Sequence, residues 1–136
     1  MELTHFSMPS TLPVFGNTRL ERSPASRPEL TANFLVRVPF VGVAQGELRI
    51  WCDLDLNRIR SHEQAFARGV LLETANILAG VSLSDLADRM DGRIMLAPPI
   101  LVERKCQAPN EGTDYHLHLL EGHCNCRVEL VSGGLA

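Results

Sequence analysis

A helical period over residues 62–80 is the feature that most constrains the fold of this chain. Its apolar face consists of Ala67, Leu71, Thr74, Ala75 and Leu78, with Val70 and Ile77 on its shoulder. The opposite stripe contains His62, Gly69, Glu73, Asn76 and Gly80. This spacing is typical of an amphipathic helix, and Ser61 stands where an N-cap residue belongs. Such a helix, about 28 Å long, buries its apolar face against another layer of the protein.

A second, shorter helix is predicted directly after the first. Its apolar residues, spaced i, i+3, i+4 and i+7, are Leu83, Leu86, Ala87 and Met90. Ser82 and Asp85 resemble a capping box at its start. Gly92 stands where a glycine commonly follows the end of a helix.

Alternating apolar and polar residues predict strands on both sides of the helices. One hairpin is expected from residues 34–43 and 46–52, and another from residues 115–120 and 124–131, around Glu121-Gly122. Between them, residues 94–102 form a strand that Pro98-Pro99 interrupts, which places it at an edge or a bend. We therefore expect an α+β fold, in which a largely antiparallel sheet of about five strands packs against a long helix and a short second helix.

The first 31 residues differ from the remainder of the chain. Prolines at positions 9, 13, 24 and 28 recur among serine, threonine and arginine without a persistent period. Because proline lacks the amide donor and disfavours helix at the preceding residue, residues 1–31 are expected to form a loosely ordered N-terminal arm. Residues 32–136 are then expected to form a single domain.

Composition excludes several classes of protein. The 136 residues carry a formal net charge of −3, so the chain lacks the positive charge that binds a nucleic-acid backbone. No apolar run is long enough to span a bilayer, which argues against a membrane protein. The N-terminus lacks the pattern of a secretory signal, and four cysteines do not make a disulfide scaffold, which argues against a small secreted protein. We therefore expect a cytoplasmic protein that binds neither nucleic acid nor membrane.

Histidines and cysteines near the C-terminus call for a test of metal binding. The group consists of His116, His118, His123, Cys124 and Cys126. In a hairpin that turns at Glu121-Gly122, the strand period puts the two cysteines on the side of Leu117 and Leu119, and the first two histidines on the other side. The group also lacks Cys-x-x-Cys spacing, which favours buried cysteines that act as small hydrophobic residues. The sequence therefore predicts no metal site.

Glu73 and Asn76 are the remaining candidate site residues. At i and i+3 of a helix, their Cβ atoms are about 5–6 Å apart. Gly69 lies one turn before the pair and Gly80 one turn after it on the same stripe, which gives another protein close access to the helix. Such a pair occurs on many solvated helices, so this spacing alone does not indicate a function.

The pair belongs to a longer motif. Residues 73–80 read Glu-Thr-Ala-Asn-Ile-Leu-Ala-Gly, residues 83–87 read Leu-Ser-Asp-Leu-Ala, and residues 96–99 read Leu-Ala-Pro-Pro. This motif resembles that of the CheC/CheX/FliY family of chemotaxis phosphatases, in which a serine or aspartate, a glutamate, an asparagine and a distant proline recur at fixed spacing. The resemblance covers about residues 69–102. The single copy of the helix is closer to the CheX arrangement than to the two helices of CheC.

The resemblance implies a phosphatase that acts on a phospho-aspartyl response regulator, the CheY-type receiver domain of two-component signal transduction. It implies that Asn76 orients the attacking water and that Glu73 pairs with a lysine of the receiver. Gly69, Gly80 and Pro99 would then belong to the partner-binding surface. The chain itself is expected to bind no cofactor, because the Mg²⁺ ion belongs to the receiver. The resemblance also makes a homodimer possible, since CheX-like proteins pair.

Three departures from the family pattern keep other hypotheses open. Gly69 stands where the pattern has serine or aspartate. The arm has no counterpart of the long N-terminal helix of CheX-like proteins, and the segment between Cys52 and His62 is shorter than in that family. The alternative is a non-catalytic interaction module that binds a receiver or a flagellar signalling partner, as similar modules do in the switch protein FliM. A third hypothesis is a homo-oligomer that buries Glu73 and Asn76 at its contact.

Overall fold

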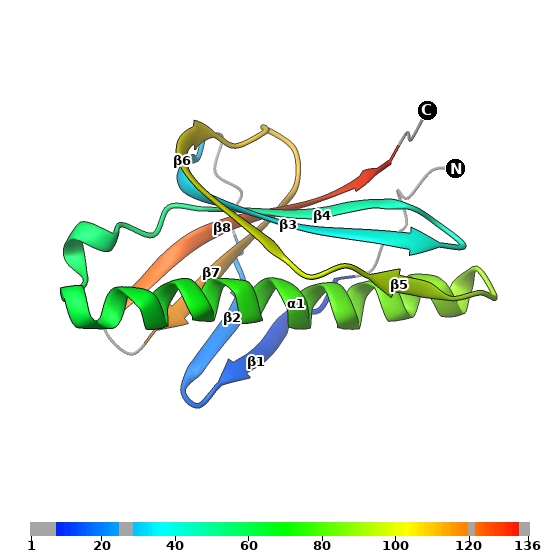
Figure 1. Ribbon diagram of the computed structural model, residues 1–136, viewed down its shortest axis with the longest axis horizontal. Coiled ribbons are helices and arrows are strands. Elements are labelled where there is room, and N and C mark those ends of the chain that lie inside the picture. The colour runs from blue at the N-terminus through cyan, green and yellow to red at the C-terminus, as the bar shows by residue number, and fades with distance from the viewer. Residues whose placement is uncertain (1–7, 25–28, 120–121, 134–136) are drawn as a thin grey trace.

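The computed structural model describes residues 8–24, 29–119 and 122–133. Within these residues a curved antiparallel sheet lies over one long helix, which confirms the α+β fold class (Figure 1). The strands are β1 (Thr11–Phe15), β2 (Thr18–Arg22), β3 (Thr31–Gly42), β4 (Gly46–Cys52), β5 (Ile94–Leu96), β6 (Ile100–Gln107), β7 (Thr113–Leu119) and β8 (Gly122–Ser132). The helices are the 3-10 turns η1 (Leu56–Arg58) and η2 (Ser61–Glu63) and the α-helix α1 (Gln64–Arg89).

The strand order of the sheet is β1-β2-β7-β8-β4-β3, and the far side of β3 pairs with both β5 and β6. β5 pairs with residues 40–42 of β3, and β6 pairs with residues 31–37. Pro98 and Pro99 therefore lie where one edge strand divides into two, in agreement with the prediction of an edge or a bend. The sheet has more strands than the five expected, because of this division and because β1 and β2 join it.

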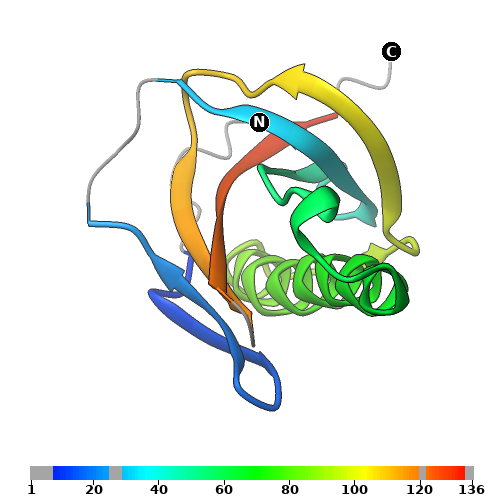
Figure 2. The same ribbon diagram turned by 90° about the vertical axis from the view of Figure 1, so that its left-hand side faces the viewer.

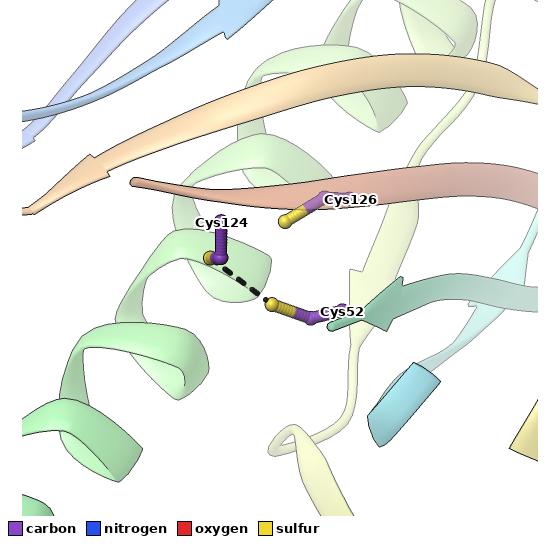
Figure 3. Close-up of side chains that lie close together, drawn as sticks. All are labelled: Cys52, Cys124 and Cys126. Carbon is purple, nitrogen blue, oxygen red and sulfur yellow. Dashed lines mark hydrogen bonds between the residues drawn. The ribbon is translucent and has the colours of Figure 1, made fainter. Parts of the chain in front are cut away.

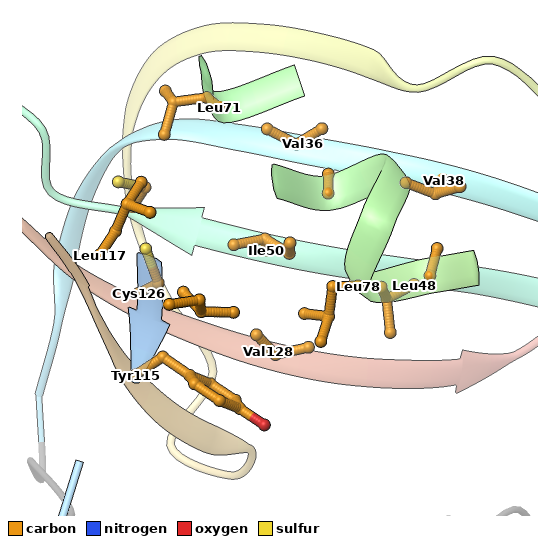
Figure 4. Packing of buried hydrophobic residues seen from close by; sticks show 14 of the residues in the cluster. Val36, Val38, Leu48, Ile50, Leu71, Leu78, Tyr115, Leu117, Cys126 and Val128 are labelled. Carbon is orange, nitrogen blue, oxygen red and sulfur yellow. The ribbon is translucent and has the colours of Figure 1, made fainter. Parts of the chain in front are cut away.

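Alternation in the strands places one row of side chains against α1. The buried residues of this row include Val36, Val38, Leu48, Ile50, Leu117 and Val128 (Figure 4). Leu71 and Leu78 of α1 pack into the same core from the other side. Figure 2 shows the sheet curving around the helix, so that the main core fills the space between the two layers.

α1 is one continuous helix of 26 residues, so the prediction of a separate second helix is wrong. A glycine inside a helix costs only about 1 kcal/mol, and no proline interrupts the segment. Ala79, Leu83 and Leu86 continue the buried face on both sides of Gly80, and their burial outweighs that cost. Ser82 is consequently buried within the helix and caps nothing.

The C-terminal end of α1 is closed by a backbone motif. Asp91 has a left-handed φ of 50°, and its amide donates to the carbonyl of Asp88 (3.2 Å). The amide of Gly92 donates to the carbonyl of Ala87 (3.0 Å), and the two bonds together form a Schellman motif. Gly92 thus lies one residue beyond its predicted position, where an added Cβ would come within 2.6 Å of the Cβ of Val43.

α1 and the turn before it, Ser61–Arg89, could cross a membrane by length and composition alone. The mean hydropathy of its most apolar window is 1.3, but 56% of that window is buried inside the fold. A helix that packs one face on a sheet is typical of the core of a globular protein. Ser61 opens η2 and does not cap α1, which begins at Gln64.

Part of the predicted N-terminal arm has regular structure. β1 and β2 form a hairpin, and β2 pairs with β7 near the other end of the chain. Leu20 is fully buried, and the hydroxyl of Tyr115 donates a hydrogen bond to the carbonyl of Pro9 (2.5 Å). The expectation of loose order is therefore wrong for residues 11–22, because their pairing partner is distant in sequence. The domain boundary after residue 31 stays a prediction.

The C-terminal hairpin has the predicted faces in a different register. Leu117 pairs with Cys124 and Leu119 pairs with Gly122, so the register is shifted by two residues from the expected one. Because side chains alternate with a period of two, this shift leaves every side chain on its predicted face. The turn expected at Glu121-Gly122 lies partly outside the described residues.

The outer face of the sheet holds a buried ion pair between Arg127 of β8 and Asp114 of β7. Their side chains are only 1% and 9% exposed. Nε of Arg127 lies 2.7 Å from Oδ1 of Asp114 and its Nη2 lies 3.1 Å from Oδ2, while Nη1 donates to the carbonyl of Pro109 (2.9 Å). The hydrogen bond to Asp114 raises the pKa of Arg127. Opposite Arg127 on β4, Trp51 packs in a smaller cluster of its own with Leu30, Ala32 and Ala108.

Candidate functional site

Glu73 and Asn76 are both exposed on the solvent stripe of α1. Thr74 and Ala75 between them are buried, so the helix register that turns those two residues to the core directs the pair outward. The side chains of Glu73 and Asn76 form no hydrogen bond or ion pair with another residue in the described part of the chain. A carboxylate and an amide are thus presented together on a rigid helix, and their polar atoms are available to a partner.

Glycines bracket this pair, as the spacing predicts. Gly69 is exposed and Gly80 is half-buried. At both positions, an added Cβ would have no neighbouring atom within 4 Å apart from the local helix backbone. Packing therefore does not require glycine at either position, and both leave a flat helix surface next to the pair.

The stripe leads into a groove between the C-terminal half of α1 and β5, with a volume of about 380 Å³. Gly80 belongs both to the stripe and to the lining of the groove. The lining also includes Leu83, Ser84 and Asp88 of α1, and Arg93 and Met95 near β5. The side chain of Met95 is strongly exposed. The sequence motif gave no signal for this groove, because it depends on β5 lying beside α1.

Pro99 is half-buried in the link between β5 and β6 and does not line the groove. The amide of Ala97, the first residue of this link, donates to the carbonyl of Pro39 (2.8 Å) and holds the link against β3. β6 is joined to α1 by a bidentate ion pair between Arg68 and Glu103 (3.0 and 2.9 Å). The structure thus places Pro99 in the edge segment that frames α1 and does not bring it into the groove.

The predicted histidine and cysteine group divides between the two faces of the sheet. Cys124 and Cys126 are buried in the core. His116, His118 and His123 lie on the opposite face, with ring centroids 5.6 to 6.3 Å apart. Nε2 of His118 lies 3.1 Å from a carboxylate oxygen of Glu21 on β2. This division follows the strand period, as the sequence predicts.

A third cysteine joins the two inner ones. Cys52, the last residue of β4, pairs with Cys126 across the sheet, and its Sγ lies 3.2 Å from that of Cys124 (Figure 3). Hydrogen bonds from Cys124 and Cys126 lower the pKa of Cys52 to about 5, and hydrogen bonding and burial raise that of Cys126. Sequence spacing missed Cys52, because only the pairing of β4 with β8 brings it to the other two.

No protein-family profile and no curated protein matches the sequence. A solved structure of the chemotaxis protein CheX from Desulfovibrio desulfuricans is 11% identical, with a TM-score of 0.47 over 85% of this chain and 83% of that chain. A chemotactic CheC-like protein from Shewanella oneidensis MR-1 is 14% identical, with a TM-score of 0.44 over 82% and 81% of the two chains. A CheC-like superfamily protein from Shewanella sp. PV-4 is also 14% identical, with a TM-score of 0.39 over 86% and 82%.

The structural neighbours of this chain are thus CheX and CheC-like chemotaxis proteins.

Proposed function

We propose that the protein is a phosphatase that hydrolyses phospho-aspartate on a CheY-type receiver domain. The observation that carries this proposal is the joint exposure of Glu73 and Asn76, without a partner among the described residues, within the motif that resembles the chemotaxis phosphatases. A solvated helix that had no partner would not require this pair to be flanked by glycines at positions that packing leaves open. The stripe has the properties of a surface that meets another protein closely.

Asn76 supplies the catalytic group in this proposal. Its side-chain amide both donates and accepts hydrogen bonds, so it can hold a water in line with the phosphorus of the acyl phosphate. Positioning of this kind resembles the role of the glutamine that orients the attacking water in GTPases. An amide is neutral and does not repel the phosphoryl oxygens, whereas a carboxylate at this position would. The Mg²⁺ ion that neutralises the phosphoryl group belongs to the receiver.

The proposal is tested by the rate at which a phosphorylated CheY-type receiver loses phosphate in the presence of Mg²⁺. We expect this protein to accelerate the loss at concentrations well below that of the receiver, because a phosphatase turns over. Acceleration only at equal concentrations would indicate binding without turnover. If several receivers lose phosphate at their intrinsic rates, the proposed activity is wrong.

In this proposal, Glu73 pairs with a lysine of the receiver and thereby fixes how the two proteins align. Glu73→Gln should therefore weaken binding to the receiver. Loss of a charge-assisted hydrogen bond to a lysine costs about 1.5–3 kcal/mol, or roughly a 10- to 150-fold rise in Kd. Titration of the phosphorylated receiver by calorimetry measures the change. Glu111→Gln, which removes the same charge from an exposed loop, is the matched control. An unchanged Kd for Glu73→Gln would contradict the lysine pairing.

The non-catalytic interaction module is the second candidate function, and Gly69 is the observation that favours it. The family pattern has serine or aspartate at this position, and the structure provides open space for either side chain. If the protein is a phosphatase, Gly69→Ser should fold normally and raise the rate of phosphate loss. Ala65→Ser, at an exposed position in the first turn of α1 outside the motif, is the control and should leave the rate unchanged. An interaction module would give no acceleration with any of these proteins, although it would still bind the receiver.

A receiver-binding protein of this kind would act in the cytoplasm, where its partner is found. We also propose a homodimer, following the family resemblance. Two edges of the sheet are available for it, β1 on one side and the β5–β6 edge on the other. Light scattering of the wild type and of a stripe variant separates an edge-paired dimer from a dimer that buries Glu73 and Asn76, because only the second is weakened by Asn76→Arg.

A further inference from the structure

Three buried thiols from β4 and β8 converge in the main core (Figure 3). Cys52 is the last residue of β4, and Cys124 and Cys126 follow one another on the inner face of β8. Cys52, Cys124 and Cys126 are only 0%, 3% and 1% exposed, respectively. The three Sγ atoms all lie within 4.8 Å of one another, and the closest two are 3.2 Å apart.

These distances are close to those of a metal site with three sulfur ligands. A metal bonded to three sulfurs at about 2.3 Å holds the sulfurs about 4 Å apart. The shortest Sγ distance would have to open by less than about 1 Å to reach this value, which rotation of the cysteine side chains can provide. The backbone already places the ligands, because paired strands fix the positions of Cys52 and Cys126 directly opposite one another.

We propose that Cys52, Cys124 and Cys126 bind one Cu(I) ion in trigonal coordination. Cysteine thiolates select soft metal ions, among which Cu(I) and Zn²⁺ are common. Structural zinc is almost always four-coordinate, and no histidine, aspartate or glutamate in the described part of the chain joins the three sulfurs.

Binding of this kind transfers no electron. The ion arrives as Cu(I), and the protons that it displaces from the thiols leave to solvent, so affinity rises with pH. Ala67 and Val70 of α1 belong to the same core cluster as the three cysteines, and with Leu119 of β7 they also line a cavity of about 210 Å³. Leu119 lies on the same strand face as Leu117, which is paired with Cys124.

Titration of the fully reduced protein with Cu(I), in competition with a coloured Cu(I) chelator and without oxygen, tests the proposal. We expect one ion per chain to be taken from the chelator. Cys52→Ser and Cys124→Ser should both lose this binding, with folding checked by circular dichroism. Cys106→Ser, which removes the partly buried cysteine of β6, is the matched control and should retain it.

X-ray absorption of the wild-type complex gives a result that depends on no variant, in case a serine in the core prevents folding. Three sulfur neighbours around copper would support the site. Copper with fewer sulfur neighbours, binding that is lost in Cys106→Ser, or no binding by the reduced protein would overturn it. Zn²⁺ bound more tightly than Cu(I) by the same three cysteines would also overturn the assignment.

Discussion

Asn76→Ala is expected to abolish the acceleration of phosphate loss while the protein still binds the phosphorylated receiver. The side chain is exposed and unpartnered within the described chain, so its removal leaves the folded state intact. Misplacement of a reacting water costs about 100-fold or more in rate, and alanine offers no atom to place it. The measurement is the rate of phosphate loss at saturating receiver, together with a binding titration of the same variant.

Two further variants sharpen this result. Asn76→Asp keeps the size of the side chain but adds a negative charge, so it should be as inactive as alanine and should bind the phosphorylated receiver more weakly. Asn57→Ala removes an exposed asparagine from η1 and should retain full activity. A rate for Asn76→Ala equal to that of the wild type would show that another residue positions the water, or that the acceleration has another origin.

Asp114→Ala is expected to produce the largest loss of stability among the substitutions considered for this chain. The guanidinium of Arg127 is 1% exposed and forms two hydrogen bonds with this carboxylate. Removing Asp114 deprives the buried charge of Arg127 of its carboxylate, and breaking a buried ion pair in this way costs about 3–5 kcal/mol. Urea unfolding followed by tryptophan fluorescence should report the change, because Trp51 lies opposite Arg127 in the sheet.

The matched control is Glu103→Ala, which removes a carboxylate from the exposed bidentate pair with Arg68. Solvent screens that pair, so its loss should change the midpoint of unfolding very little. Equal effects of Asp114→Ala and Glu103→Ala would contradict the special weight that burial gives to the Arg127–Asp114 pair. Replacing Arg127 and Asp114 together by hydrophobic residues of similar size should recover part of the lost stability.

Local patterns predicted those parts of the fold whose causes are local. The alternation in residues 34–52 predicted the β3–β4 hairpin. Pro98-Pro99 predicted an edge, because proline has no amide hydrogen to donate to a strand ladder. The β1–β2 hairpin was missed, since its partner strand lies near the other end of the chain. The continuity of α1 was missed because Gly80 weakens a helix only locally, whereas burial against the sheet depends on the whole fold.

The candidate site divides in the same way. The exposure of Glu73 and Asn76 follows from the helical period, so their placement was predictable from the sequence. The groove beside Gly80 requires β5 to lie along α1, and the cluster around Cys52 requires β4 to pair with β8. Both are contacts between segments far apart in the chain, and no spacing within either segment specifies them.

The pairing of β2 with β7 has a consequence for synthesis of the protein. The β1–β2 hairpin leaves the ribosome before β7, the strand that it joins, has been made. Until then, apolar Leu20 is without its cover and the hydrogen-bonding edge of β2 is open. Open strand edges pair readily with other chains. The interval between the synthesis of β2 and that of β7 is therefore one in which the open edge of β2 favours aggregation of the nascent chain.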